Sequence, residues 1–253
     1  MEYIQDITVS QYNFIFNAFS FGFATMLAAT LFLWLQRSQV AEGYKTAVTI
    51  SGLVTFIAAY HYLQIFLSWE AAFNVVDGQI SLTGKEFNVA YRYVDWLLTV
   101  PLLLVELILV MKLSKSETAN KAWTLGIAAA LMIILGYPGE VAEDSGTRAL
   151  WGALSMIPFL YIVFQLFVGL NESISRQPDD VKGLIVLARN LTVAAWFFYP
   201  IVYFAPFLGF EGSDATTIVE VGYTIADIVA KAVFGILIYT IAVRKSQSEK
   251  GIL

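Results

Sequence analysis

Long apolar segments constrain this sequence more than any other feature. Each runs for roughly 20 residues or more, which is enough for a helix to cross about 30 Å of hydrocarbon. Transmembrane β-strands would instead alternate over about 10 residues. We expect membrane-spanning helices at about 10–36, 44–69, 87–112, 119–138, 147–171, 182–209 and 216–243. The sequence therefore predicts an all-α membrane protein, a seven-transmembrane helix bundle that forms a single domain over 1–253 and crosses the cell (plasma or inner) membrane several times.

The composition excludes several other classes of protein. Hydrophobic residues make up 58% of the chain and charged residues 14%, whereas soluble domains are about 45–50% apolar and about 25% charged. A net charge of −5 argues against a nucleic-acid partner. The absence of cysteine excludes a secreted module held by disulfides. The lipid bilayer is the expected partner.

Two local signals mark the loops between the spans. Pro178 cannot continue a helix and is followed by charged residues, so it ends the fifth span. Asp77 and Gly78 stand between two short apolar segments after the second span. This arrangement predicts a short β-hairpin.

The lysine and arginine residues of the loops predict the orientation. If the N-terminus is outside, ten of them are cytoplasmic: Arg37, Lys45, Lys112, Lys115, Lys121, Arg176, Lys182, Arg244, Lys245 and Lys250. Only two, Lys85 and Arg148, are outside. The outer loops are acidic instead and contain Glu70, Asp77, Glu140, Glu143, Asp144, Glu211 and Asp214. Because Glu2 and Asp6 replace a basic segment at the N-terminus, no cleaved signal peptide is expected.

Ionisable side chains inside the predicted spans are the candidate functional residues. Such a group costs several kcal/mol at membrane depth unless it is paired or hydrated. Arg189 is the exception, because it lies about two turns into the sixth span and can reach the cytoplasmic interface. The remaining candidates are Arg92, Asp95, Glu106, Asp227 and Lys231.

Lys231 lies in the middle of the seventh span, and Asp227 precedes it by four residues on the same helix face. One interpretation is a buried ion pair that holds the bundle together, although such pairs stabilise poorly compared with apolar packing. The other is a desolvated amine that forms a Schiff base with an aldehyde cofactor. Asp227 would then supply part of the counter-charge.

Asp95, Thr99 and Glu106 share one face of the third span. At about 100° per residue, Thr99 and Glu106 lie about 40° and 20° from Asp95 around the axis, and the two acids are about 16 Å apart along it. Each acid could independently cap a neighbouring helix. Two acids on one stripe favour instead a path for protons.

The predicted orientation gives this path a direction. Asp95 lies on the outer side, close to Arg92 and to the Lys231 cation, and is expected to be ionised. Glu106 lies toward the cytoplasm in an apolar segment and is expected to stay protonated, because burial disfavours the charged form. Two carboxyl groups in opposite protonation states permit directional transfer. The predicted direction is from cytoplasm to exterior.

These segments resemble the microbial rhodopsins, in particular the proteorhodopsin and xanthorhodopsin-like proton pumps. The resemblance covers essentially the whole chain. It rests on Arg-Tyr-Val-Asp-Trp-Leu-Leu-Thr-Val-Pro at 92–101, Tyr-Thr-Ile-Ala-Asp-Ile-Val-Ala-Lys at 223–231, Gly-Tyr-Pro-Gly-Glu at 136–140 and Trp-Phe-Phe-Tyr-Pro at 196–200. It implies all-trans retinal bound to Lys231 as a protonated Schiff base and isomerised by light.

The resemblance also assigns roles to the acids. It makes Asp95 the primary proton acceptor and counterion, Asp227 the second counterion and Glu106 the proton donor. Thr99 completes the triplet typical of outward proton pumps. A lone histidine is usually a packing residue, but the pumps place a histidine at His61 that hydrogen-bonds to the acceptor acid. We therefore expect His61 to bond to Asp95 and to modulate its proton affinity.

Several further residues match the retinal pocket of this family: Trp96, Met132, Gly136, Trp196, Tyr199 and Tyr223. Such residues are also ordinary helix-packing material, but flat rings beside a polyene would restrict which bond rotates. Pro101 and Pro200 are expected to kink their helices, which membranes tolerate. Leu103 stands at the family's colour-determining position, where an apolar residue indicates green absorption.

Gly152 separates this chain from proteorhodopsin, for which the resemblance predicts a bulky tryptophan against the retinal ring. The missing indole is expected to open a lipid-facing window for a hydroxylated carotenoid antenna, as in the xanthorhodopsin branch. The alternative is a small residue that permits close helix contact.

The leading functional hypothesis is a light-driven outward proton pump. A sodium or chloride pump would carry a different residue at Asp95, Thr99 or Glu106. A photosensory rhodopsin that signals through a membrane transducer is the main alternative, although such sensors usually lack a cytoplasmic donor like Glu106. A retinal-free transporter or receptor is a further alternative. The resemblance also implies a homo-oligomer, either a pentamer or a trimer, and the protein is not expected to be an enzyme.

Overall fold

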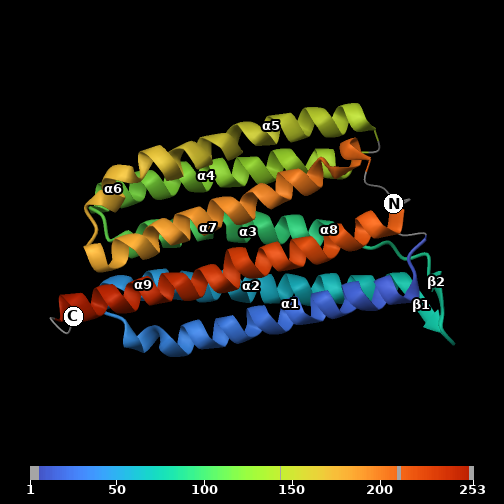
Figure 1. Ribbon diagram of the computed structural model, residues 1–253, viewed down its shortest axis with the longest axis horizontal. Coiled ribbons are helices and arrows are strands. Elements are labelled where there is room, and N and C mark those ends of the chain that lie inside the picture. Colours follow the sequence, from blue (N-terminus) through green and yellow to red (C-terminus); the bar gives the residue numbers. More distant parts are fainter. Residues whose placement is uncertain (1–5, 143, 210–211, 251–253) are drawn as a thin grey trace.

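The computed structural model describes residues 6–142, 144–209 and 212–250. Within them, seven helical segments are long and apolar enough to cross a membrane, which confirms the predicted bundle. Three acids named above, Glu2, Glu143 and Glu211, lie outside the described residues. Figure 1 shows the helices lying lengthwise beside one another, with the N-terminal end and the hairpin at one end of the bundle and the C-terminal end at the other.

Five of the spans are single helices: α1 (Val9–Gln36), α2 (Glu42–Ala72), α3 (Ala90–Met111), α4 (Lys115–Glu140) and α7 (Asp179–Tyr203). The fifth span consists of α5 (Ser145–Phe164), the π-helical turn η3 (Gln165–Gly169) and α6 (Asn171–Ser175). The seventh consists of α8 (Gly212–Asp227), the π-helical turn η5 (Ile228–Val233) and α9 (Phe234–Glu249). Two short 3-10 turns, η2 (Arg37–Gln39) and η4 (Ala205–Leu208), follow α1 and α7.

Several helix ends differ from the prediction because the apolar segment and the helix do not end at the same residue. The fourth span begins four residues earlier than expected, since the hydroxyl of Ser114 accepts a hydrogen bond from the backbone N–H of Glu117 and caps α4. Asp144 caps α5 in the same way through Thr147. The sixth span ends at Tyr203 instead of 209, where the chain enters η4.

The predicted hairpin is present after α2. Strands β1 (Phe73–Val76) and β2 (Gln79–Leu82) pair antiparallel, with Val76 opposite Gln79. Asp77 and Gly78 form the two-residue turn with φ values of 49° and 74°. Positive φ at both positions is typical of the type I′ turn, which matches the twist of the flanking strands.

Polar and apolar side chains are distributed as expected for a protein in lipid. Large apolar side chains such as Phe21, Leu35 and Ile157 are exposed on the outside of the bundle. The interior contains an apolar core together with buried polar side chains, many of them on α3 and on the seventh span. Pro101 and Pro200 both lie inside continuous helices, α3 and α7. The fold therefore brings the polar faces of the third and seventh spans together inside the bundle.

Candidate functional site

Lys231 lies in the π-helical turn η5 and is 1% exposed. Its Nζ lies 2.7 Å from Oδ2 of Asp95 on α3 and 2.6 Å from Oδ1 of Asp227, four residues earlier on its own helix. Both acids are 1% exposed. The predicted amine and the two predicted acids therefore meet in a water-poor interior, where unscreened charges interact strongly.

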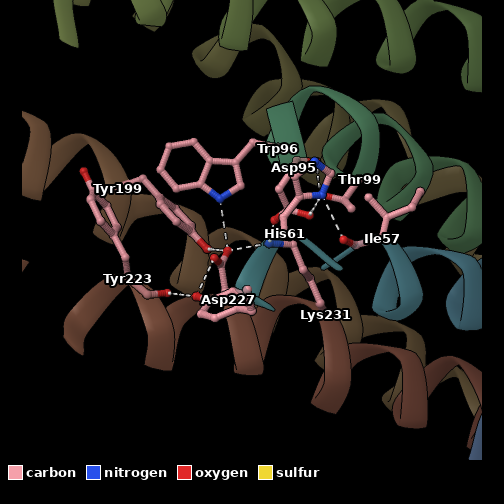
Figure 2. A network of polar contacts seen from close by, with 10 residues as sticks. Ile57, His61, Asp95, Trp96, Thr99, Tyr199, Tyr223, Asp227 and Lys231 are labelled. Carbon is pink, nitrogen blue, oxygen red and sulfur yellow. Dashed lines mark hydrogen bonds and ion pairs between the residues drawn. The ribbon is translucent and has the colours of Figure 1, made fainter. Parts of the chain in front are cut away.

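Asp227 accepts more hydrogen bonds than Asp95 (Figure 2). The Tyr62 hydroxyl donates to Oδ2 at 2.8 Å, while the Tyr199 hydroxyl and Trp96 Nε1 donate to Oδ1 at 2.8 and 3.1 Å. Because these three neutral donors stabilise a carboxylate, Asp227 is held as an anion beside Lys231. Tyr62 was not among the residues predicted from the sequence.

Asp95 is held less firmly. Its Oδ1 has no hydrogen-bond partner among the described residues. The hydroxyl of Thr99 donates to the backbone carbonyl of Asp95 at 2.8 Å and not to the carboxylate. Asp95 therefore has a free acceptor atom next to the Lys231 amine.

The predicted hydrogen bond between His61 and Asp95 is absent, and this prediction was wrong in its geometry. His61 is 6% exposed and its Nδ1 lies 3.9 Å from Oδ1 of Asp95, which is too long for a hydrogen bond. The same nitrogen lies 2.9 Å from the backbone carbonyl of Ile57 (Figure 2). That carbonyl is one turn earlier on the same helix, so the imidazole reaches it without leaving α2. The ring is a neighbour of the acid and not its bonded partner.

Arg92, which was expected near Asp95, forms an ion pair with another acid, Glu220. Its Nη2 lies 2.6 Å from Oε2 of Glu220 on α8, and the guanidinium stacks 4.9 Å from the ring centre of Tyr223. Both members of the pair are buried. Glu220 was missed at the sequence level, although it is an acid inside the seventh predicted span. It precedes Asp227 by seven residues, which places both on the same helix face.

Glu106 is fully buried on α3, closer to the C-terminal end of the helix than Asp95. Neither of its carboxyl oxygens has a hydrogen-bond partner in the described part of the chain. Burying a carboxylate without a partner is costly, so this environment favours a neutral carboxylic acid.

An apolar cavity of about 780 Å³, including the space at its open side, begins at Lys231. The predicted pocket residues all line it: Trp96, Leu103, Met132, Gly136, Gly152, Trp196, Tyr199 and Tyr223. Helices α3, α4, α5 and α7 and the seventh span all contribute residues to the wall of the cavity. An elongated apolar ligand with one end at Lys231 suits this cavity.

A family model described as bacteriorhodopsin-like protein matches residues 13–245, which is most of the chain. The chain belongs to this family of microbial rhodopsins. It is thus a retinal protein of the light-driven ion-pump rhodopsins, with seven membrane spans, and not an enzyme.

Three relatives illustrate the similarity. The crystal structure of xanthorhodopsin, described as a light-driven ion pump with dual chromophore, is 51% identical and superposes with a TM-score of 0.93 over 96% of this chain and 98% of that one. A thermophilic rhodopsin is 44% identical with the same TM-score, over 97% of this chain and 98% of that one. The green-light absorbing proteorhodopsin of Gamma-proteobacterium EBAC31A08 is 31% identical over 228 residues, which cover 89% of this chain and 85% of the relative.

Membership of the rhodopsin family implies retinal on a lysine. The residues of this rhodopsin fit that group, because the cavity reaches a buried lysine, its walls are largely aromatic and aliphatic, and two carboxylates lie beside the positive charge. Lys231 would hold the group, and the cavity residues would surround it.

Gly152 lies in the wall of the cavity at its α5 side and is itself buried. A Cβ atom at this position would lie 2.6 Å from Cε1 of Tyr203 and 2.8 Å from Cζ of Phe204. Such distances are too short for carbon atoms, so the rings of Tyr203 and Phe204 occupy the space that a side chain would need. The glycine is covered by these rings and does not itself face lipid.

Arg189 lies apart from the site. Its Nε and Nη1 donate to the side-chain oxygens of Asn190 and Asn171 at 3.1 and 3.3 Å, and the guanidinium lies 4.5 Å from the ring centre of Phe167. These contacts hold the guanidinium against η3 and α6.

Proposed function

We propose that this rhodopsin is a light-driven outward proton pump with retinal attached to Lys231. The observation that carries the proposal is the position of the Lys231 amine between two buried carboxylates, with a third buried acid, Glu106, farther along α3 toward the cytoplasm. When bound, retinal absorbs light and isomerises, which changes the proton affinity of the Lys231 nitrogen.

Asp95 is the proposed acceptor of the Lys231 proton. Its Oδ2 lies at hydrogen-bond distance from the nitrogen, and its Oδ1 has no partner among the described residues. Asp227 is equally close but already accepts bonds from Tyr62, Tyr199 and Trp96, which favour its charged form. Asp227 therefore acts as the permanent second counterion.

Proton release to the exterior and proton return to the Lys231 nitrogen use opposite ends of the same path. The Arg92–Glu220 pair lies on the outer side of Asp95 and provides the next charged groups toward the exterior. Glu106 lies on the inner side and, as a neutral acid, returns a proton to the Lys231 nitrogen. We assign the positioning roles to Thr99, which is bonded to the backbone of Asp95, and to His61, which lies beside its carboxylate.

The pH of the medium under illumination measures the direction of pumping. Illuminated cells in unbuffered medium are expected to acidify it, and a protonophore should abolish the change. Alkalinisation would contradict the assigned direction. A coloured protein that gives no pH change would favour a photosensor that signals through a membrane transducer.

Glu106→Gln should keep the colour nearly unchanged, because residue 106 does not line the cavity beside Lys231. The return of the proton to the Lys231 nitrogen should slow by about 100-fold, the usual contribution of a positioned proton donor. Flash spectroscopy measures this rate, with Glu117→Gln at the cytoplasmic surface as the control. An unchanged rate would remove Glu106 from the donor role.

We also propose green absorption, from the apolar Leu103 in the cavity wall, and a hydroxylated carotenoid antenna at Gly152. The similarity to a pump with a dual chromophore supports the antenna, which would lie over the rings of Tyr203 and Phe204 that cover Gly152. The chain is further proposed to form a pentamer or a trimer.

Gly152→Trp tests the antenna. An indole at 152 has to displace the rings of Tyr203 and Phe204, so it should abolish energy transfer from an added hydroxylated carotenoid while the retinal band remains. The excitation spectrum for pumping measures the transfer, and Gly183→Trp, at an open position on α7, is the control. Transfer that survives in Gly152→Trp would exclude this site.

A further inference from the structure

A second cavity opens at the cytoplasmic end of the bundle. It encloses about 900 Å³, including the space at its open side. The start of α2, the ends of α3 and α9, the start of α4 and the segment before α7 surround it. The lining residues include Tyr44, Met111, Lys112, Glu117, Gln177 and Lys245. None of the residues assigned to the proton path lines this cavity.

Lys245 forms the inner wall of this cytoplasmic cavity and is only 6% exposed. Its Nζ donates to the backbone carbonyls of Val110 and Met111 at 3.1 and 2.9 Å and to Oε1 of Gln177 at 2.7 Å. Among the described residues it forms no ion pair, whereas Lys112 on the outer side of the same cavity pairs with Glu249 at 2.6 Å. A buried cation without a carboxylate is unusual, and here the carbonyls at the C-terminal end of α3 stabilise it.

The carbonyls that hold Lys245 belong to the same helix as Glu106. Val110 lies one turn beyond Glu106 on α3, a rise of about 6 Å. Glu106 is fully buried and does not line the cytoplasmic cavity. Lys245 therefore joins α9, the end of α3 and the segment before α7 at the level that separates the cavity from Glu106.

We propose that Lys245 is a positioning residue that closes the route by which Glu106 takes up a proton from the cytoplasm. The closed state has Nζ bonded to the carbonyls of α3 and to Gln177. The open state requires these hydrogen bonds to break so that water reaches Glu106. This proposal rests on the proposed function, in which Glu106 is a protonated donor.

Hydrogen–deuterium exchange of the Glu106 carboxyl tests the closure in the retinal-loaded protein kept in the dark. The infrared C=O band of the protonated acid is identified by its loss in Glu106→Gln. Lys245→Met should speed the exchange of this band by about tenfold or more, because opening no longer breaks the bonds of Lys245. Lys245→Arg keeps the charge and donors and should restore slow exchange. Lys112→Met removes a cation from the same cavity whose amine pairs with Glu249 and does not bond the carbonyls of α3, so it should leave the rate unchanged.

Three outcomes would overturn the proposal. The first is exchange in Lys245→Met at the wild-type rate. The second is faster exchange in Lys245→Met for which Lys245→Arg does not restore the slow rate, together with a general rise in amide exchange along α3. This combination would indicate only a lost structural contact. The third is the absence of a protonated Glu106 band in the wild type, which would also overturn the donor role. If Lys245→Met does not fold, Gln177→Ala removes one contact and should speed exchange by about threefold, and an unchanged rate there counts against the proposal.

Discussion

Replacing Lys231 with alanine is expected to abolish both the visible absorption band and every light-driven pH change. The cavity reaches one buried lysine amine among the residues that line it, and alanine offers no nitrogen for retinal. The measurement is the absorption spectrum of the purified protein after retinal is added, together with the pH trace under light. The loss should be complete.

The control for this experiment is Lys182→Ala, because Lys182 pairs with the exposed Asp179 and does not line the cavity. Removing Lys231 also leaves Asp95 and Asp227 without their cation, and breaking a buried pair costs about 3–5 kcal/mol. The variant must therefore also be shown to be folded, which is the case if the apoprotein elutes as a single species in detergent. A folded Lys231→Ala protein that retains a visible band would refute the assigned attachment site.

Asp95→Asn is expected to stop outward pumping while the protein still binds retinal. Asparagine cannot accept the proton from the Lys231 nitrogen, so loss of that proton should slow by about 100-fold or more. The absorption band should move to longer wavelength, because the carboxylate stabilises the positive charge that lies at Lys231 before light is absorbed. Flash spectroscopy and the static spectrum measure the two effects.

The matched control is Asp227→Asn, which removes the other carboxylate, 2.6 Å from Lys231 against 2.7 Å for Asp95. Its three donors, Tyr62, Tyr199 and Trp96, would lose their anion, so this variant should be less stable than Asp95→Asn. Asp227→Asn should retain a proton acceptor in Asp95. Pumping that persists in Asp95→Asn and is lost only in Asp227→Asn would exchange the two roles.

The sequence predicted the elements whose signals are local. Apolar length predicted the spans, the Asp77-Gly78 pair predicted the hairpin, and helical spacing predicted that Asp227 would lie beside Lys231. The family resemblance predicted the residues that line the cavity, including those from helices far apart in the chain.

Contacts between helices were harder to predict, because they depend on how far side chains reach across the bundle. Arg92 was expected near Asp95, one turn away on α3, but its guanidinium extends to Glu220 on α8. His61 was expected to reach across to Asp95, but the carbonyl of Ile57 on its own helix is closer. Helical periodicity predicts which residues share a face of one helix. It does not predict which residue of another helix a long side chain contacts.

The two ion pairs of Lys231 differ in how they are built into the chain. Asp227 is attached to the same helix as the amine, so it moves with it as one body, whereas Asp95 belongs to a separate helix. A tilt or rotation of the seventh span against the third would consequently lengthen one contact and leave the other intact. Movement between the two helices would therefore act on the contact with Asp95, the proposed acceptor, and not on the contact with Asp227.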